Sequence, residues 1–349
     1  MKEMLRIVGM SDWVYWLSHY LSAFFMHLIT VTLMMLFVCV KRNAEGRAFI
    51  QSSDPLLLFC ILMCFCSSCI MHATLLSMFF ASPHSAVAGA MLYWTLCCIM
   101  PFLALENAGG EGYRFISREQ KLATSIFPAM SLHWSFRVLE RFEKFVEYGA
   151  NWGNFSDRSV TPDNVTLAEI VFIGFTCDCI IAIAVWYLDN VMPVGPGIAR
   201  PWLYPFQVSY WIPATTVIEP PALPEQEMHN FEQDPKGNLV AIHIVQATKR
   251  YEDLVAVQDA NLRIFENQIT VLLGHNGAGK TTLLSMVTGW TRCTTGIILV
   301  GGYDITTCTK DARKSFGYCT ENNILFDDLT VEEHLVFFAV VRLVERRLI

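Results

Sequence analysis

Four long apolar stretches dominate the first half of the chain. They cover residues 17–40, 55–80, 85–105 and 167–188. The first three contain no Asp, Glu, Lys or Arg, and the last contains only Glu169 and Asp178. A helix that crosses the hydrocarbon core of a bilayer needs about 20 mainly apolar residues. Because buried helices of a soluble core would not give three successive charge-free runs of this length, the pattern predicts four membrane-spanning helices.

The second half has a different pattern, with short apolar runs separated by turn residues. We expect strands at Val240–Val245, Asn261–Phe265, Ile269–Leu273 and Gly296–Val300, and helices at Lys280–Thr288 and Val331–Val344. Strands that alternate with helices are typical of an α/β domain. The predicted domain order is therefore a membrane domain over residues 1–189, a linker over 190–237 and an α/β domain over 238–349.

Two connections have features of their own. Residues 106–165 join the third and fourth spans, and part of this connection has apolar side chains at helical spacing: Phe136, Val138, Leu139, Phe142, Phe145 and Val146. Periodicity alone leaves open whether this helix lies at the membrane surface or rests on protein. Residues 190–237 hold most of the chain's 14 prolines, which predicts an extended connector without regular helix or strand.

Composition and charge exclude several classes of protein. The 349 residues are 53% hydrophobic and 16% charged, which is too apolar for an ordinary soluble protein. The formal net charge is −7 and the basic residues are scattered, so nothing indicates a nucleic-acid partner. The 12 cysteines lie mostly in the predicted spans and lack the paired spacing of a zinc site. They are interpreted as small apolar side chains.

One motif in the α/β domain carries recognisable chemistry. It consists of Gly274, His275, Asn276, Gly277, Ala278, Gly279, Lys280, Thr281 and Thr282. A glycine, four residues and then Gly-Lys-Thr, between a strand and a helix, is the pattern of a loop that wraps nucleotide phosphates in backbone N–H groups. The helix N-terminus adds partial positive charge. We expect Lys280 to reach the outer phosphates and the Thr281 hydroxyl to hold Mg2+, so ATP and Mg2+ are the predicted ligands.

The sidedness of the chain follows from this loop. It must face the cytosol to meet ATP, and one span separates it from two N-glycosylation acceptors, Asn154 and Asn164. The connection 106–165 is therefore expected on the outer side, and four spans return residues 1–16 to the cytosol. The distribution of Lys and Arg does not support this arrangement by the positive-inside rule. The prediction depends instead on the number of spans and on the need for ATP.

Several short segments follow one another along nearly the whole chain: Lys2–Met10 before the first span, Trp186–Trp211 after the fourth, the phosphate loop Gly274–Thr282, Gly301–Asp304 and Asn323–His334. Together they resemble the A subfamily of ABC transporters, the large lipid exporters of eukaryotes. Each match is short, but their order and spacing are specific and extend over nearly the whole chain. The resemblance implies an α-helical polytopic membrane domain with four spans, followed by a partial α/β P-loop NTPase domain, the ABC ATPase. It also implies that residues 121–147 form a helical pair in the outer leaflet.

The same resemblance assigns roles to two further residues. Tyr251 occupies the position whose ring stacks on adenine in these domains, and a strand-end tyrosine that packs on protein is the alternative. Glu321 stands where the family has a glutamine that touches Mg2+, so it is a doubtful metal ligand. The family's signature loop, catalytic carboxylate and switch histidine are not found in these 349 residues. The chain is therefore expected to belong to an ATP-hydrolysing family without having a complete catalytic site of its own.

The sequence thus predicts an ATP-driven transporter, of lipids by resemblance, in a plasma or intracellular vesicle membrane. Its expected partners are membrane lipids and a second nucleotide-binding domain, from another half or another chain. Two alternatives stay open: a non-catalytic membrane protein that pairs with or interferes with a full-length transporter, and an exporter of another substrate. Asp178 lies mid-span, where a charge costs about 2.5–3.5 kcal/mol on insertion scales. A polar contact between helices and a role in the substrate path are equally compatible with it.

Overall fold

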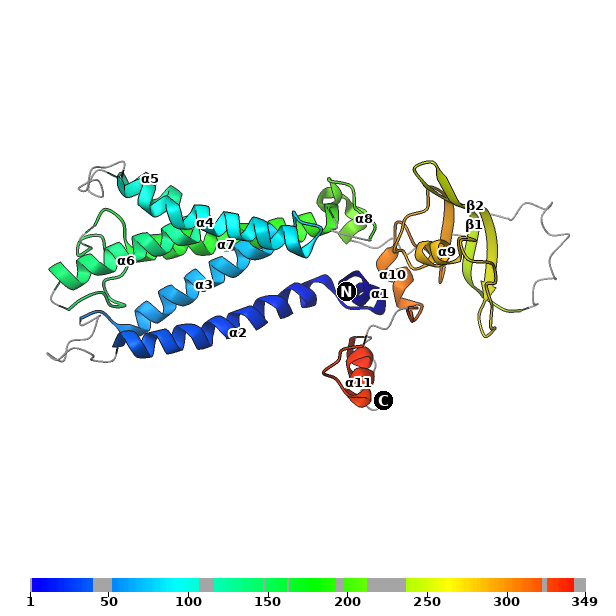
Figure 1. Cartoon of the computed structure of the whole chain (residues 1–349), viewed down its shortest axis with the longest axis horizontal. Coiled ribbons are helices and arrows are strands. Elements are labelled where there is room, and N and C mark those ends of the chain that lie inside the picture. The colour runs from blue at the N-terminus through cyan, green and yellow to red at the C-terminus, as the bar shows by residue number, and fades with distance from the viewer. Residues whose placement is uncertain are drawn as a thin grey trace. The chain divides into compact units, whose positions relative to one another are not determined.

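The computed structural model describes residues 2–39, 52–106, 116–146, 148–161, 163–192, 197–211, 237–321 and 325–341. They form two compact units, and Figure 1 labels the helices α1–α11 and the strands β1 and β2. The helical unit comprises Trp16–Val194, and the α/β unit comprises Met1–Tyr15 together with Gly195–Ile349. The N-terminal helix α1 (Lys2–Val8) therefore belongs to the α/β unit, although the helical unit lies between them in the sequence.

Four long apolar helices make up most of the helical unit. They are α2 (Asp12–Cys39), α3 (Pro55–Ser77), α4 (Pro83–Glu106) and α7 (Leu167–Val191). Each is long and apolar enough to cross a membrane, which confirms the predicted helical fold with four spans. The helix ends differ from the predicted ones by a few residues, and α2, for example, begins at Asp12 and not at residue 17.

Polar side chains fix where two of these helices begin. Asp54 accepts a hydrogen bond from the Leu56 N–H at 2.8 Å, at the start of α3. Thr166 and Glu169 form a reciprocal pair at the start of α7, in which each side chain accepts from the other's N–H at 3.2 Å. Such caps satisfy backbone donors that have no partner inside the helix. The starts of these helices are therefore determined by local sequence.

A pair of shorter helices packs against the long ones. These are α5 (Arg118–Thr124) and α6 (Pro128–Phe145), the pair expected over residues 121–147. Helix α6 contacts α3, α4 and α7, and its Trp134, Val138 and Phe142 are at most 1% exposed. The amphipathic face predicted in this connection therefore rests on protein. Phe145, at the end of that face, is exposed.

The connection between α4 and α7 also buries an ion pair. Lys121 Nζ lies 2.7 Å from Asp163 Oδ1 and 2.7 Å from Asn164 Oδ1. The Lys121 and Asp163 side chains are 1% and 2% exposed. Burial lowers the pKa of Lys121 to about 8 and raises the pKa of Asp163 to about 6. Between these values both groups are charged, and each compensates the other for lost hydration.

An antiparallel sheet in the order β2-β1-β3-β4 organises the α/β unit. Its strands are β1 (Val240–Tyr251), β2 (Leu254–Phe265), β3 (Thr295–Val300) and β4 (Tyr303–Asp304). Helix α9 (Lys280–Val287) packs on the sheet through Met286, which is fully buried with Ile244 and Ile298. Two further helices follow, α10 (Thr309–Lys314) and α11 (Val331–Val341). The last residues of the helix predicted at Val331–Val344 lie outside the described residues.

One predicted strand does not form. Ile269–Leu273 was expected to be a buried strand, but it is not part of the sheet, and Ile269, Val271 and Leu273 are 96%, 67% and 85% exposed. A strand that is buried on both faces needs neighbouring strands to accept its backbone hydrogen bonds. None of the strands in the described residues pairs with this segment. The prediction is therefore wrong for this segment because its pairing cannot be supplied locally.

The proline-rich linker also contains more structure than predicted. A 3-10 turn, η2 (Tyr204–Phe206), and a short helix, α8 (Val208–Trp211), follow one another there. The Arg200 guanidinium lies 5.7 Å from the Tyr204 ring centroid and 4.7 Å from that of Tyr210, close enough for cation–π attraction. Pro205 lies in the first turn of η2, where a missing N–H costs no hydrogen bond. The prediction of no regular helix is therefore wrong here, while residues 212–236 lie outside the described residues.

Candidate functional site

The phosphate loop has a backbone that only glycine adopts easily. Gly277 and Gly279 have φ of 83° and 87°, in the left-handed region. A Cβ atom on Gly279 would lie 2.4 Å from the Ala256 carbonyl oxygen, which is backbone and cannot move aside cheaply. Glycine removes both the strain and the collision. The chain therefore makes a tight bend immediately before α9 begins at Lys280.

Lys280 occupies the inside of this bend. Its Nζ donates hydrogen bonds to the carbonyl oxygens of Gly274, at 2.6 Å, and His275, at 2.8 Å. The ammonium group is thus held by two backbone oxygens at the point where a phosphate would approach the N–H groups of the loop and of α9. An anionic group there gains both the charge of Lys280 and the partial charge of the helix N-terminus.

The other residues of the loop take the positions that the motif predicts. Thr281 and Thr282 lie in the first turn of α9, and Thr281 is exposed. The His275 ring turns back on the loop, with Nδ1 2.9 Å from the Asn276 carbonyl oxygen. Residues 274–278 are all exposed. The backbone N–H groups, and not the imidazole, are therefore the chemical feature that this part of the loop offers to a ligand.

Two of the predicted site residues form no hydrogen bond with the phosphate loop in the described part of the chain. Tyr251 ends β1, is 45% exposed and has Lys249 Nζ 4.8 Å from its ring centroid. Glu321 is an exposed residue after α10. Within the described residues, no hydrogen bond or ion pair joins either side chain to the phosphate loop. Their assignments as adenine platform and metal ligand stay predictions.

Arg313 is a residue that sequence reasoning missed. It lies on α10, is 9% exposed, and donates to the carbonyl oxygens of Thr288, at 3.1 Å, and Gly289, at 3.0 Å. These carbonyls end helix α9, so Arg313 satisfies acceptors that have no partner inside the helix. Its Nη2 also lies 2.9 Å from Glu3 Oε1 on α1. Arg313 therefore links the far end of the phosphate-loop helix to the N-terminal helix.

No local signal in the sequence identifies this arrangement. Glu3 and Arg313 are 310 residues apart, and each would be an ordinary charged residue on the surface of its own helix. Arg6 of α1 belongs to the same cluster of charged side chains, because it pairs with Glu3 and also with Asp12. Only the three-dimensional fold brings these charges together.

The two predicted glycosylation acceptors have different environments. Asn154 is 6% exposed, its Nδ2 donates to the Gly149 carbonyl at 2.8 Å, and its Oδ1 accepts from the Asn151 N–H. Asn164 is exposed, although its Nδ2 donates to the Ile116 carbonyl at 3.1 Å and its Oδ1 accepts from Lys121. A glycan on Nδ2 needs solvent on that side, and of the two only Asn164 lies at the surface.

Two protein families match most of the chain. Residues 1–187 match the family described as ABC-2 family transporter protein, and residues 257–347 match the family described as ABC transporter. A solved structure described as an ATP binding subunit of an ABC transporter is 25% identical, with a TM-score of 0.29 over 31% of this chain and 45% of that one.

Individual relatives agree with these family matches. The human phospholipid-transporting ATPase ABCA3 is 32% identical over an alignment of 358 positions, which covers 99% of this chain and 20% of that protein. The human retinal-specific phospholipid-transporting ATPase ABCA4 is 32% identical over 366 aligned positions, which cover 98% of this chain and 15% of that protein. The rat ATP-binding cassette sub-family A member 17 is 29% identical over 359 aligned positions, which cover 98% of this chain and 19% of that protein.

The chain spans a fifth or less of the length of these relatives. The phosphate loop, the four apolar helices and the two family matches nevertheless agree with one another. The chain belongs to the ABC-2 family of transporter proteins, whose model matches more than half of it, and the relatives that it resembles over nearly its whole length include a protein named as a member of ATP-binding cassette sub-family A.

Proposed function

We propose that this protein is an ATP-driven transporter that moves lipids across a membrane. The observation that carries the proposal is the phosphate loop, with glycine-only bends at Gly277 and Gly279 and with Lys280 inside the bend, in a chain with four helices that can cross a membrane. Relatives named as phospholipid-transporting ATPases support lipid as the substrate class.

The residues of the loop have distinct proposed roles. The N–H groups from Gly274 to Thr282 and the Lys280 ammonium bind the β- and γ-phosphates, and the Thr281 hydroxyl holds Mg2+. On nucleotide binding, Lys280 Nζ exchanges its two carbonyl acceptors for phosphate oxygens. Tyr251 stacks on adenine. Glu321 is the weakest of these assignments, because a carboxylate has no amide donor and adds negative charge beside the γ-phosphate.

A second nucleotide-binding domain is the proposed protein partner. Residues 274–278 of the loop are exposed, and in this family two such domains close over ATP. Closure moves the spans, and hydrolysis reopens the pair. A polypeptide of residues 1–349 by itself is expected to bind nucleotide weakly and to hydrolyse almost none, because the groups that orient the attacking water in this family are not among its residues.

We also propose the sidedness of the chain. Residues 1–16 and the α/β domain face the cytosol, and the connection 106–165 faces the lumen or the exterior of a plasma or vesicle membrane. A glycan on Asn164 is the expected mark of that outer side, because Asn164 is exposed whereas Asn154 is 6% exposed.

Nucleotide binding by the whole chain tests the proposal. The chain is purified in lipid nanodiscs, and the affinity for a fluorescent ATP analogue is measured with Mg2+ present. Lys280→Ala should weaken binding by about tenfold or more, because a charge-assisted hydrogen bond to phosphate is lost. Lys310→Ala, an exposed lysine on α10, is the matched control and should bind as the wild type does. Equal affinity of the wild type and Lys280→Ala would overturn the proposal.

A further inference from the structure

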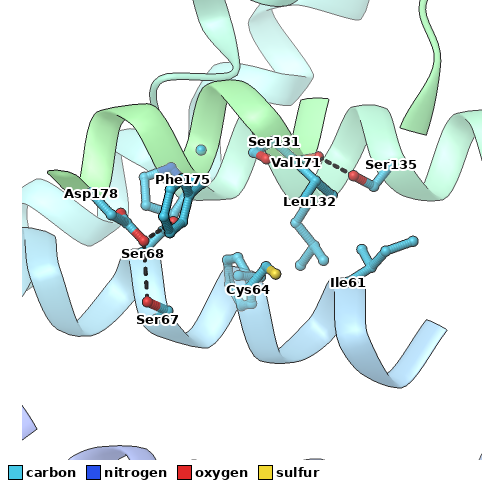
Figure 2. Close-up of a pocket in the computed structure, with 13 residues that line it drawn as sticks. Ile61, Cys64, Ser67, Ser68, Ser131, Leu132, Ser135, Val171, Phe175 and Asp178 are labelled. Carbon is cyan, nitrogen blue, oxygen red and sulfur yellow. Dashed lines mark hydrogen bonds between the residues drawn. The ribbon is translucent and has the colours of Figure 1, made fainter. Parts of the chain in front are cut away.

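Polar side chains in the middle of the membrane-spanning helices contact one another. Ser67 Oγ and Ser68 Oγ on α3 each donate a hydrogen bond to Asp178 Oδ2 on α7 at 3.1 Å (Figure 2). Asp178 thus makes a polar contact between two helices, and the neighbouring cavity of about 60 Å³ between α3, α6 and α7 has a mainly apolar wall. Residues 197–211, which we call the aromatic segment, have the opposite arrangement, with polar groups turned inward and apolar side chains exposed.

The aromatic segment is held together by its polar and aromatic groups. The Arg200 guanidinium lies against the rings of Tyr204 and Tyr210. These two rings meet edge to face, with their centroids 4.9 Å apart, and Tyr204 is only 1% exposed. The indole N–H of Trp211 donates to the Pro205 carbonyl oxygen at 2.8 Å. The turn η2 and the helix α8 therefore form one small folded unit around the cation.

The outer surface of this unit is apolar. Its large exposed side chains range from 44% to 83% exposure, and they are Trp202, Leu203, Phe206, Val208 and Trp211. Exposed apolar side chains that gather in so short a segment mark an interaction site. Interfaces between proteins have a polar rim, whereas among the exposed residues described in this segment Gln207 is the only polar one. This composition favours a lipid surface over a protein partner.

The chain connection places a membrane within reach of the aromatic segment. Helix α7, which is long and apolar enough to cross a membrane, ends at Val191. Only residues 192–196 separate that end from the segment. Because an extended chain advances about 3.3–3.6 Å per residue, the segment begins within about 20 Å of the end of α7. The headgroup layer that α7 enters is therefore close enough to be its partner.

The charge pattern of the sequence agrees with a membrane partner. Residues 190–218 contain one charged residue, Arg200, and no Asp or Glu, although 16% of the whole chain is charged. Anionic lipids repel acidic side chains that lie near the membrane surface, and Trp and Tyr are the residues enriched at the boundary between membrane and water. Irregular backbone such as that of η2 does not face lipid inside the hydrocarbon core. The headgroup layer is therefore the depth that suits this segment.

We propose that the aromatic segment docks on the headgroup layer of the membrane that α7 spans, with Trp202, Phe206 and Trp211 inserted beside the upper carbons of the acyl chains. Arg200 acts as a positioning residue, because its contacts with Tyr204 and Tyr210 hold η2 and α8 together. Docking fixes the first part of the linker to the α/β unit at the membrane surface. The inference goes beyond the proposed function and does not depend on nucleotide binding or on the transported substrate.

Photo-crosslinking in the full chain tests this docking. Phe206 is replaced by the photoreactive amino acid p-benzoylphenylalanine, and the chain is illuminated in nanodiscs of phosphatidylcholine and phosphatidylserine. Leu254, which is 67% exposed at the start of β2, is replaced in the same way as the control. Mass spectrometry should find about tenfold more lipid adducts at position 206 than at 254, the factor by which burial of one aromatic side chain shifts an equilibrium. Equal numbers of lipid adducts, or adducts at 206 mainly with protein, would overturn the proposal.

Serine substitutions test whether the exposed side chains hold the segment at the membrane. The photoreactive group is placed at Val208, and Trp202→Ser and Phe206→Ser are then introduced together. Lipid adducts at position 208 should fall about tenfold, because the inserted apolar surface is lost. Leu254→Ser is the matched control and should leave them unchanged. An unchanged number of lipid adducts in the double variant would refute insertion of these two side chains.

Nucleotide binding on the same preparations separates this inference from the proposed function. If lipid adducts at 206 do not exceed the control while ATP binding still depends on Lys280, the docking is wrong and the proposed function stands. If ATP binding does not depend on Lys280, the proposed function fails, and the crosslinks still decide the docking. Should the double serine variant lose nucleotide binding through misfolding, Phe206→Ser alone takes its place, and unchanged lipid adducts in it would equally refute insertion.

Discussion

The helical unit and the α/β unit differ in how far each residue depends on distant partners. All four predicted spans form helices that end within a few residues of the predicted ends. In the α/β unit, Ile269–Leu273 has the composition of a strand and yet lies exposed before the bend at Gly277 and Gly279. A helix satisfies its backbone hydrogen bonds within its own segment, whereas a strand obtains them from its neighbours. Composition is therefore sufficient to predict a span, but it does not ensure that a strand will be paired.

The buried ion pair tests whether the helical unit also depends on distant contacts. Lys121→Met leaves the buried Asp163 with only the longer contact to Arg141, whose Nη1 lies 3.9 Å from Asp163 Oδ1, and we expect a loss of about 3 kcal/mol in unfolding free energy. Lys144→Met is the matched control, because Lys144 pairs with Glu140 on the surface of α6 with 62% exposure. Its loss should be under about 1 kcal/mol. Thermal unfolding in detergent measures both, and equal losses would refute a structural role for the buried pair.

Nucleotide binding by the phosphate loop should depend on the backbone conformation of its glycines, a dependence that we do not expect of the spanning helices. Gly279→Ala places a methyl group 2.4 Å from the Ala256 oxygen at φ 87°. We expect nucleotide affinity to fall about 100-fold, because the strained loop no longer presents its N–H groups together. Gly317→Ala has open space around the new methyl group and serves as the control. Full affinity in Gly279→Ala would mean that the loop does not bind phosphate in this conformation.

Removal of the Arg313 cap at the end of α9 should have an intermediate effect on the stability of the α/β unit. Arg313→Gln removes the charge that pairs with Glu3 and weakens the bonds to Thr288 and Gly289. We expect a loss of about 1–3 kcal/mol in the stability of the α/β unit, together with faster hydrogen exchange in α1. Lys314→Gln, at 75% exposure, is the control on the same helix. If hydrogen exchange in α1 is unchanged in Arg313→Gln, the ion pair with Glu3 does not stabilise α1.

The smallest effect on stability is expected for a substitution in Ile269–Leu273, the segment that pairs with no strand. Ile269→Ala changes a side chain that is 96% exposed and should alter stability by less than about 0.5 kcal/mol. Ile298→Ala, in strand β3 of the sheet, removes a fully buried side chain and should cost about 2–5 kcal/mol. Chemical denaturation followed by circular dichroism compares the two. Similar costs would mean that Ile269–Leu273 is a buried strand after all.

The sequence-based predictions succeed where the information is local. The four spans, the bend at Gly277 and Gly279 and the helix that follows it depend on composition or on short motifs, and the caps at Asp54 and Thr166 lie next to the helices that they begin. Three features escape this reasoning because they join distant segments. They are the Lys121–Asp163 pair, the Glu3–Arg313 link and the hydroxyl contacts of Asp178.

One of the missed contacts had a usable signal. Helices α3 and α7 both begin on the side expected to be the outer one, so residues at equal distance from their starts lie at equal depth. Ser67 and Ser68 lie about as far into α3 as Asp178 lies into α7. A pair of hydroxyl groups in a charge-free span, level with a carboxylate in another span, could therefore have been predicted as its partner. The two other contacts have no comparable pattern in the sequence.

Membrane sidedness is the most direct test of the central claim, that one polypeptide joins four spans to a cytosolic nucleotide-binding domain. Epitope tags are placed before residue 2, after residue 349 and, in a third version, within residues 107–115. Each version is then treated with protease in sealed microsomes. We expect both terminal tags to be digested from the cytosolic side, and the tag within 107–115 to be protected until detergent is added. Terminal tags on opposite faces would contradict it.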